Sequence, residues 1–293
     1  MESWSAFALG LSLPIAYAFT AIMGQLSMAG GANAIGASST RQFTAAAVFA
    51  LYIWWTKVDT AIPWRQRVVA SLLGAGHAFV SWSLYTSFSD LPVGVAILIL
   101  YGFPIMTAVA SWLLGTERPD WTTAIALIVA FIGLLLAIDL GGGEVRARGV
   151  FFASLAAIGF ATIMMVSERL FKGVRAQPRT FHTLIGGAIA NILILLFVAT
   201  PLYPNTPLGW FGLWGNAAFY SFAIIGLYAA IAKLGALKTA MLLNMEPIGT
   251  IMLAWLILGQ RLSPIQLVGA ALVIGSILFV SRPRSVASGA KQG

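Results

Sequence analysis

Residues 93–114 read VGVAILILYGFPIMTAVASWLL, a continuous run without a charged side chain. An apolar helix needs about 20 residues to cross about 30 Å of hydrocarbon, so this stretch is long enough to span a membrane. The rest of the chain has the same character, because its 293 residues are 59% hydrophobic and 9% charged, with a mean hydropathy of +0.90. A chain this apolar cannot cover a globule in water, which excludes an ordinary soluble domain.

Nine other apolar runs follow the same pattern, each bounded by charged or turn-forming residues. One span with its short connection uses about 28 residues, so the chain has room for about ten spans. The sequence therefore predicts an all-α integral membrane protein with ten transmembrane helices. The expected helices cover residues 5–28, 40–56, 69–88, 93–114, 121–138, 150–171, 180–200, 211–232, 239–258 and 264–281.

The lysine and arginine residues indicate the direction in which the chain enters the membrane. Of the 17 basic residues, 13 belong to even-numbered connections or to the C-terminal segment, and 4 belong to the other side, namely Arg41, Arg146, Arg148 and Arg261. Cytoplasmic connections carry an excess of basic residues, so both termini are predicted to be cytoplasmic. The basic residues are spread over separate connections without interleaved aromatic residues, so the net charge of +8 does not predict a nucleic-acid partner.

The first half of the sequence aligns with the second when Pro104 is placed on Pro247. The other matched pairs at this offset are Tyr17 with Phe160, Tyr85 with Tyr228, Trp112 with Trp255 and Arg118 with Arg261. Each copy contains five spans, an odd number, so the second copy enters the membrane from the opposite side. We expect two inverted five-helix repeats, at residues 1–138 and 150–281. Residues 139–149 form the expected linker between them, and residues 282–293 form a cytoplasmic tail.

Two ionisable residues are expected well inside the membrane. Glu246 lies about seven residues, or about 10 Å of helix rise, from the start of the helix expected at 239–258. His77 lies about eight residues, or about 12 Å, from the start of the helix expected at 69–88. An ionisable side chain inside the membrane costs several kcal/mol unless it faces a cavity or a partner. Both residues are therefore candidates for substrate binding. A structural pair that ties neighbouring helices together is the alternative.

One helix face in each repeat carries a stripe of residues spaced four apart. The stripes are His77, Ser81 and Tyr85 in the first copy and Tyr220, Ile224 and Tyr228 in the second. Tyr17, Tyr101 and Asn244 can add ring faces and hydrogen-bonding groups to a pocket between them. Simple aromatic packing, and bridging between helices by Asn244, are the alternatives. The predicted substrate-binding residues are Tyr17, His77, Ser81, Tyr85, Tyr101, Tyr220, Tyr228, Asn244 and Glu246.

We expect neither a lysine nor an arginine at the centre of a span. Arg41 falls at the outer end of the helix expected at 40–56, where its side chain can extend to the lipid headgroups. Phosphorylated substrates, which need a fixed cation, are therefore not expected, and neutral, zwitterionic or cationic solutes fit better. The chain has no cysteine, and its two histidines are far apart in sequence, so we expect no metal and no cofactor.

Pro104 and Pro247 occupy matched positions inside the helices expected at 93–114 and 239–258. Each removes one backbone hydrogen bond from its helix, so the pair is predicted to act as the two hinges of an alternating gate. Static kinks that only shape the bundle are the alternative.

Residues 244–248 (NMEPI), 256–263 (LILGQRLS) and 266–272 (QLVGAAL) resemble the end of the second repeat in the EamA family of the drug/metabolite transporter superfamily. Residues 115–118 (GTER) are similar to the matching turn of the first repeat. The resemblance extends over the whole chain and implies ten helices in a basket around a central cavity. It also implies an inner-membrane exporter of amino acids or other small metabolites.

We therefore predict a secondary transporter that exports small zwitterionic or neutral metabolites by alternating access, in particular amino acids, aromatic ones included. A multidrug exporter of cationic aromatic compounds or a substrate exchanger is the alternative, and a non-transporting membrane scaffold is a remote one. An enzyme is not expected, because one acid and two histidines do not supply the converging groups that catalysis needs. The expected partners are a small-molecule substrate and the lipid bilayer. The oligomeric state is left open, and a monomer is compatible with the sequence.

Overall fold

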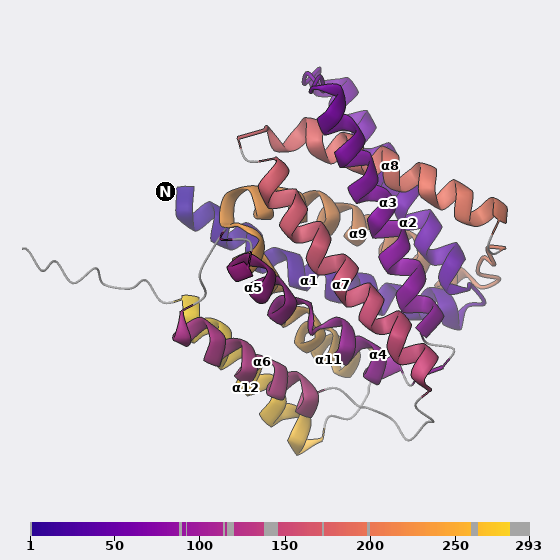
Figure 1. Ribbon diagram of the computed structural model, residues 1–293. Helices are drawn as coiled ribbons and strands as arrows, with labels where there is room; N and C mark the ends of the chain where they lie inside the picture. Colours follow the sequence, from indigo (N-terminus) through magenta and orange to yellow (C-terminus); the bar gives the residue numbers. More distant parts are fainter. Residues whose placement is uncertain are drawn as a thin grey trace, which may run out of the picture.

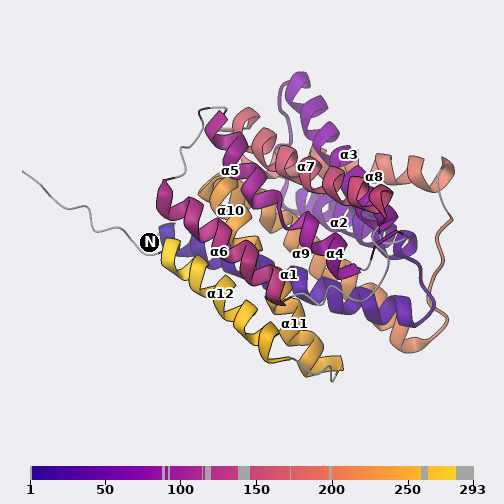
Figure 2. The same ribbon diagram turned by 60° about the horizontal axis from the view of Figure 1, so that its bottom comes forward.

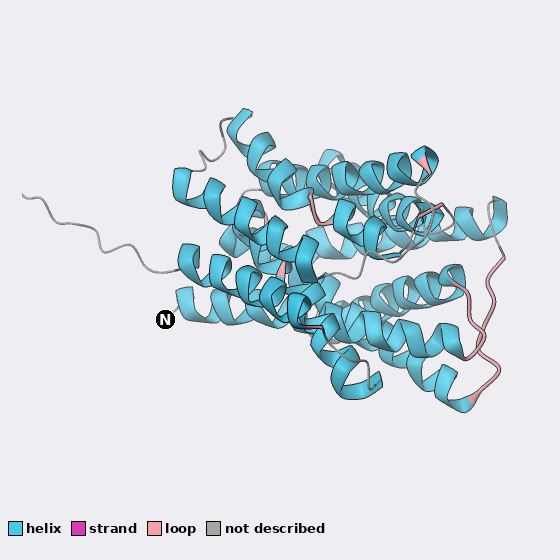
Figure 3. Cartoon of the chain, turned by 90° about the horizontal axis from the view of Figure 1, so that it is seen from below, coloured by secondary structure: helices cyan, strands magenta, loops and turns pink. Residues whose placement is uncertain are grey.

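The computed structural model describes residues 2–87, 90–91, 93–113, 115, 120–137, 146–171, 173–197, 200–258 and 263–281. Every regular element within these residues is an α-helix, as the sequence predicts, and helices make up most of the described chain (Figure 3). The described helices are α1 (Glu2–Ala29), α2 (Ala34–Thr56), α3 (Trp64–Ser87), α4 (Val93–Leu100), α5 (Phe103–Leu113), α6 (Trp121–Ala137), α7 (Ala147–Leu170), α8 (Ala176–Phe197), α9 (Pro207–Leu234), α10 (Ala236–Leu243), α11 (Met245–Leu258) and α12 (Pro264–Ser281).

Two of the expected spans are wrong as single helices. The stretch at 93–114 contains α4 and α5, which are separated by Tyr101 and Gly102. The stretch at 239–258 contains part of α10 and all of α11, which are separated by Asn244. The offset that matches the two repeats places Tyr101 on Asn244, so the two breaks occur at matched positions.

The two matched prolines explain the breaks. Pro104 lies in the first turn of α5 and Pro247 in the first turn of α11. Proline has no backbone N–H to donate, so it is tolerated in the first turn of a helix but interrupts a helix interior. The Gly102 N–H donates to a carbonyl three residues earlier at 3.1 Å, and the Asn244 N–H does the same at 3.2 Å. Each break is therefore a tight turn followed by a new helix that begins beside the proline.

Several of these helices are suited to a lipid bilayer. Six described stretches are long and apolar enough to cross a membrane, namely Ala8–Ala29, Val95–Leu113, Ala147–Leu170, Ala176–Phe197, Pro207–Leu234 and Ala236–Ile257. Trp121–Ala137 and Pro264–Ser276 are apolar but shorter. The prediction of ten spans is therefore supported for six by length and composition, and the full number stays a prediction.

Helices from the two halves of the sequence interleave in space. α1 packs against α9 and α11, α3 packs against α7 and α8, and α2 contacts α8 and α9. α6 and α12 form an adjacent pair at one edge of the bundle (Figures 1 and 2). Of the linker expected at 139–149, residues 139–145 lie outside the described residues, as does the tail expected at 282–293.

Glycine allows two of these helix pairs to approach closely. A Cβ atom on Gly186 of α8 would meet the backbone of Ser71 on α3, and a Cβ atom on Gly269 of α12 would meet the backbone of Ala137 on α6. Small residues at helix contacts are a common basis of packing in membranes, where helices gain little from the hydrophobic effect.

Polar contacts join the connections at the two ends of the bundle. The Asn33 side chain donates to the Thr200 carbonyl at 3.0 Å and accepts from the Leu202 N–H at 3.0 Å, which joins the α1–α2 connection to the α8–α9 connection. Asp59 in the α2–α3 connection lies 3.8 Å from Arg175, just before α8.

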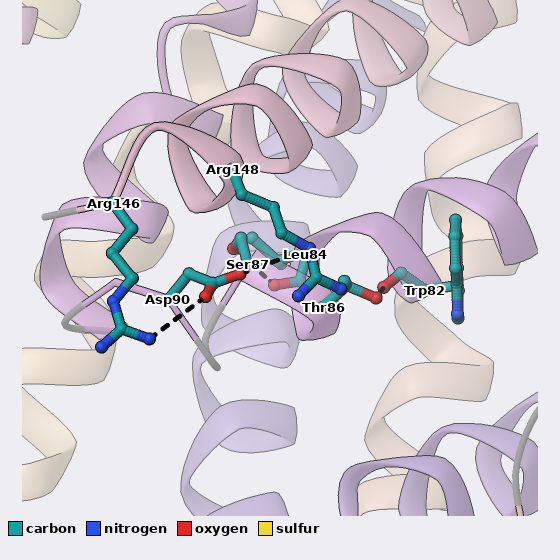
Figure 4. Close-up of polar contacts among 7 residues, drawn as sticks. All are labelled: Trp82, Leu84, Thr86, Ser87, Asp90, Arg146 and Arg148. Atoms are coloured by element: carbon teal, nitrogen blue, oxygen red, sulfur yellow. Dashed lines mark hydrogen bonds and ion pairs between the residues drawn. The ribbon is translucent and has the colours of Figure 1, made fainter.

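A third contact involves the connection between α3 and α4. The buried Asp90 carboxylate lies 3.9 Å from Arg146 Nη1 and 3.7 Å from Arg148 Nε, so it faces two arginines at the start of α7 (Figure 4). The start of α1 and the end of α12 lie at the same end of the bundle (Figures 1 and 2). The first described helix therefore begins on the side of the bundle where the last described helix ends.

Candidate functional site

The two helix breaks bring a half-buried acid next to a tyrosine. Tyr101 lies in the break between α4 and α5, and its hydroxyl donates a hydrogen bond to the Glu246 carboxylate in the first turn of α11. Asn244, which forms the other break, is buried two residues before Glu246. Interrupted helices at membrane depth expose backbone and side-chain polar groups to a cavity, which is how many transporters build a substrate site.

A second group of residues lies where α1, α2 and α9 meet. The Tyr17 ring meets the Tyr220 ring edge to face, with centroids 6.5 Å apart. The Arg41 guanidinium carbon lies 4.5 Å from the centroid of the Tyr220 ring, which is a cation–π contact. The Tyr220 hydroxyl donates to Gln42 Oε1 at 3.1 Å, which fixes the ring against α2.

A third group lies between α3, α5, α7 and α9. The His77 ring is 5.5 Å from the Phe160 ring and 6.3 Å from the Tyr228 ring, measured between centroids. Phe160 also contacts Phe103 edge to face at 4.7 Å, and Phe103 lies 5.9 Å from Tyr101. Aromatic rings thus lead from the α4–α5 break to His77.

Electrostatic interactions connect these groups into one site. Glu246 interacts with Tyr17 as well as Tyr101, and the Arg41 guanidinium acts on Glu246, Tyr17 and His77. A carboxylate, a guanidinium and an imidazole therefore share one aromatic surrounding in the middle of the bundle.

Four buried polar atoms in this site have no hydrogen-bond partner among the described residues. They are Tyr17 Oη, His77 Nδ1, Tyr228 Oη and Asn244 Oδ1. Buried polar groups are nearly always hydrogen-bonded in native proteins, so an unpartnered group calls for a water or a ligand. The concentration of four such atoms around Glu246 and the rings makes this place the candidate binding site.

The structure brings together six of the nine predicted residues, which are Tyr17, His77, Tyr101, Tyr220, Tyr228 and Glu246. Asn244 is buried in the second helix break, two residues before Glu246. Ser81 is half-buried on α3 one turn from His77, outside the ring contacts above. The side chain of Tyr85 lies outside the described residues. The assignment of a binding role to all nine stays a prediction.

Sequence reasoning missed four neighbours of the site. Phe160 and Phe103 are the repeat partners of Tyr17 and Glu246, so the alignment of the two repeats contained the signal for both. Arg41 and Gln42 were missed because the second helix begins earlier than expected. Asn33 is the N-cap of α2, and its side chain accepts from the Gly36 N–H at 2.8 Å.

The expectation for Arg41 is therefore wrong. Because α2 begins at Ala34, Arg41 lies two turns into the helix instead of at its end, and its guanidinium packs on Tyr220. Arg41 is thus a basic side chain that packs inside the bundle and does not end a helix. A fixed cation is therefore present, and phosphorylated substrates are no longer disfavoured for lack of one.

Two cavities lie away from these residues. The larger, of about 420 Å³, lies between α3 and α7 and is lined mainly by apolar side chains that include the exposed Leu72 and Phe79. The smaller, of about 10 Å³, lies between α2, α3 and α8. Within the described residues, no three histidine or acidic side chains come together as a metal site requires.

Comparison with known proteins defines the family. Residues 4–138 and residues 147–282 each match the EamA-like transporter family. The chain belongs to this family. The resemblance of residues 244–272 is thereby confirmed, and the protein is a multi-pass membrane transporter and not an enzyme.

The chain is also similar, over most of its length, to proteins that are named as transporters. It is 27% identical to the uncharacterized transporter YyaM of Bacillus subtilis over 224 residues, which are 73% of this chain and 70% of YyaM. It is 27% identical to the uncharacterized transporter sll1319 of Synechocystis over 228 residues, which are 75% of this chain and 68% of sll1319. A crystal structure with 18% identity has the same fold, with a TM-score of 0.75 over 94% of this chain and 97% of that chain.

Proposed function

We propose that this protein is an inner-membrane secondary transporter that exports small zwitterionic or neutral metabolites, amino acids above all, by alternating access. The observation that carries the proposal is the pair of matched helix breaks, which place Glu246 beside Tyr101 at the centre of the bundle. Broken helices around a polar site at membrane depth suit a solute that must lose its water shell on the way across.

Matched contacts support an inverted repeat, on which alternating access depends. The ring pair of Tyr17 and Tyr220 corresponds, in the alignment of the two repeats, to the ring pair of Phe160 and His77, and both pairs are in contact. The packing of α1 on α9 corresponds in the same way to the packing of α7 on α3. Two copies that swap places in this manner can exchange conformations, which opens the site first to one side and then to the other.

The contacts between connections support the predicted ten-span topology, in which successive connections alternate between the two faces. Each contact joins connections of the same parity in the predicted topology: Asn33 with Leu202, Asp90 with Arg148, and Asp59 with Arg175. If one span between two contacting connections were missing or added, the contact would join connections on opposite faces of the membrane. The ten-span topology with both termini in the cytoplasm agrees with all three.

The side chains of the site fit an amino acid. Glu246 and the amide oxygen of Asn244 can accept hydrogen bonds from an ammonium group, and the tyrosine hydroxyls can bond either end of a zwitterion. The rings of Tyr17, Tyr220 and Phe160 offer apolar faces to an aliphatic or aromatic side chain.

A cationic aromatic compound is the second candidate substrate. Several rings surround a single carboxylate at Glu246, and a cation over an aromatic face gains about 2 kcal/mol when it is desolvated. A multidrug exporter needs these two features, a set of rings and an acid.

Purified transporter in sealed liposomes without ATP tests the proposal. We expect saturable counterflow of at least one amino acid, driven by its own gradient. The Glu246→Gln variant keeps the shape of the acid but removes its charge, and it should lose about tenfold of this flux, since a charged hydrogen bond contributes about 1.5–3 kcal/mol. The variant Asp59→Asn, on an exposed connection, should transport like the wild type.

The alternative results are distinct. Counterflow of cationic amines without any amino acid would favour the multidrug exporter. Liposomes that carry neither class of compound in a saturable manner would contradict the transport proposal.

A further inference from the structure

Arg41 is a cation inside the proposed substrate site. It lies eight residues after the N-cap Asn33, about 12 Å along α2, and is half-buried. A charged side chain at such depth is costly unless it faces a polar cavity or a partner, so it is a functional candidate. Its guanidinium is held over the Tyr220 ring at 4.5 Å, and Tyr220 is in turn fixed by its hydrogen bond to the neighbouring Gln42.

Arg41 and Glu246 both act on Tyr17, and Arg41 does so next to the Tyr220 ring that meets Tyr17 edge to face at 6.5 Å. Arg41 belongs to α2 and Glu246 to α11, yet both interact electrostatically with Tyr17 of α1. The Tyr17 hydroxyl, which has no partner within the described residues, lies in the region acted on by both charges. A positive and a negative group around one unpartnered hydroxyl form a site with two charged ends.

The hydrogen-bonding groups differ at the two ends. At the acidic end, Glu246 and Asn244 Oδ1 are acceptors, and Asn244 Oδ1 is unpartnered within the described residues. At the basic end, the planar guanidinium of Arg41 offers several N–H donors, a geometry that matches a carboxylate. A free amino acid has a complementary arrangement, with an ammonium and a carboxylate on the same carbon.

We infer that Arg41 is the residue that selects a carboxylate on the substrate, with Glu246 and Asn244 accepting hydrogen bonds from the ammonium group. This inference rests on the proposed function, because it takes the central site as the place where substrate binds. It also separates the two candidate substrates. Arg41 attracts a zwitterion through its carboxylate but repels a cation that has none.

Matched pairs of probes test the role of Arg41. Each pair consists of an amino acid and the amine that lacks only its carboxylate: phenylalanine with phenethylamine, and leucine with 3-methylbutylamine. Flux of each probe is measured in liposomes that contain the full chain as wild type, Arg41→Gln or Arg41→Lys. Arg65→Gln is the control, because Arg65 is an exposed residue at the start of α3.

The wild type should prefer at least one amino acid over its amine by about tenfold or more. Arg41→Gln should lose about tenfold of the amino-acid flux while the flux of the amine is unchanged or higher, since one charged contact is worth about tenfold or more in affinity. Arg41→Lys, which keeps the charge, should retain part of the preference. Arg65→Gln should match the wild type.

A purely structural role predicts a different pattern. If Arg41 only holds Tyr220 in place, Arg41→Gln lowers amino-acid and amine flux alike, which overturns the inference and leaves the proposed function standing. If Arg41→Gln prefers the amino acid over its amine as strongly as the wild type does, the inference is likewise overturned and the proposed function stands. A wild type that moves the amines but neither amino acid overturns the inference in favour of cationic substrates. A wild type that moves none of the four probes contradicts the proposed function, and the inference falls with it.

Discussion

At the scale of single residues, Arg179 is a buried cation that borders the proposed site through Tyr228. Its position before the expected helix at 180–200 predicted a basic residue in a connection, but it lies in the first turn of α8 and is 1% exposed. Its guanidinium donates to the carbonyl of Ser167 at 3.3 Å and to the carbonyl of Tyr228, and it lies 5.6 Å from the ring centroids of Phe171 and Tyr228. The cation therefore sits near the C-terminal end of α7, where the helix dipole favours positive charge.

We expect Arg179 to act as a clamp between three helices. Arg179→Gln removes the charge and leaves a side chain too short to reach both carbonyls, so the unfolding temperature in detergent should fall by several degrees, at about 2–4 °C per kcal/mol. Arg175→Gln, in the exposed pair with Asp59, should change it by about 1 °C or less. Equal melting curves for the two variants would show that the buried contacts of Arg179 contribute little.

Removal of Arg179 from the loop residues leaves the charge argument intact. Arg41 packs on Tyr220 and Arg179 is buried against α7 and α9, so neither is a residue of a free connection. Without these two, one from each side of the count, the division of the basic residues is 12 to 3 in place of 13 to 4. Neither position could be assigned from sequence, because a basic residue near a helix end looks the same whether it faces headgroups or packs inward. The contacts of α2 and α8 with α9 are what show that these two arginines pack inward.

At the scale of helices, the sequence located most elements but not their interruptions. Long apolar runs determine where a span lies, and the prolines indicated that helices at 93–114 and 239–258 were unusual. A proline can bend a helix or separate two helices, and the choice depends on what the freed carbonyls and the next turn contact. Here the turn at Tyr101 places its hydroxyl on Glu246, a contact across the two repeats that no local pattern contains.

Replacement of both prolines tests whether the breaks move during transport. Pro104→Ala and Pro247→Ala each restore a backbone donor, which favours a continuous helix through the break. We expect slower exchange of substrate, by severalfold in each variant, with normal expression and insertion. Pro207→Ala is the matched control, because Pro207 is the first residue of α9, where a proline costs nothing. Wild-type flux in both single variants and in the double variant would make the breaks static.

The close packing of α3 on α8 leads to a second prediction at this scale. A Cβ atom on Gly186 would collide with the Ser71 backbone, so Gly186→Ala should separate the helices and lower the unfolding temperature by several degrees. Gly275→Ala in α12 is the control, because a Cβ atom there has nothing within 4 Å among the described residues. Thermal unfolding in detergent compares the two, and equal stabilities would mean that α3 and α8 adjust without cost.

At the scale of the whole molecule, the two repeats are built into each other. The strongest packing is between helices of different halves, such as α1 with α9 and α3 with α7, so neither half has the site by itself. The internal repeat was visible in the sequence because matched residues such as Pro104 and Pro247 share one offset. The interleaving was not visible, because the offset does not say which helix of one copy packs against which helix of the other.

The direction of the whole chain in the membrane gives the last prediction. The native chain has no cysteine, so single cysteines can be labelled without background. Ala61 and Thr200 are exposed in the α2–α3 and α8–α9 connections, which the 12 to 3 division of charges places in the cytoplasm and outside respectively. A membrane-impermeant thiol reagent should label Thr200→Cys in intact cells with a permeable outer layer, and Ala61→Cys only after the inner membrane is opened. The reverse pattern would invert the orientation, and labelling of both variants in intact cells would contradict a single topology.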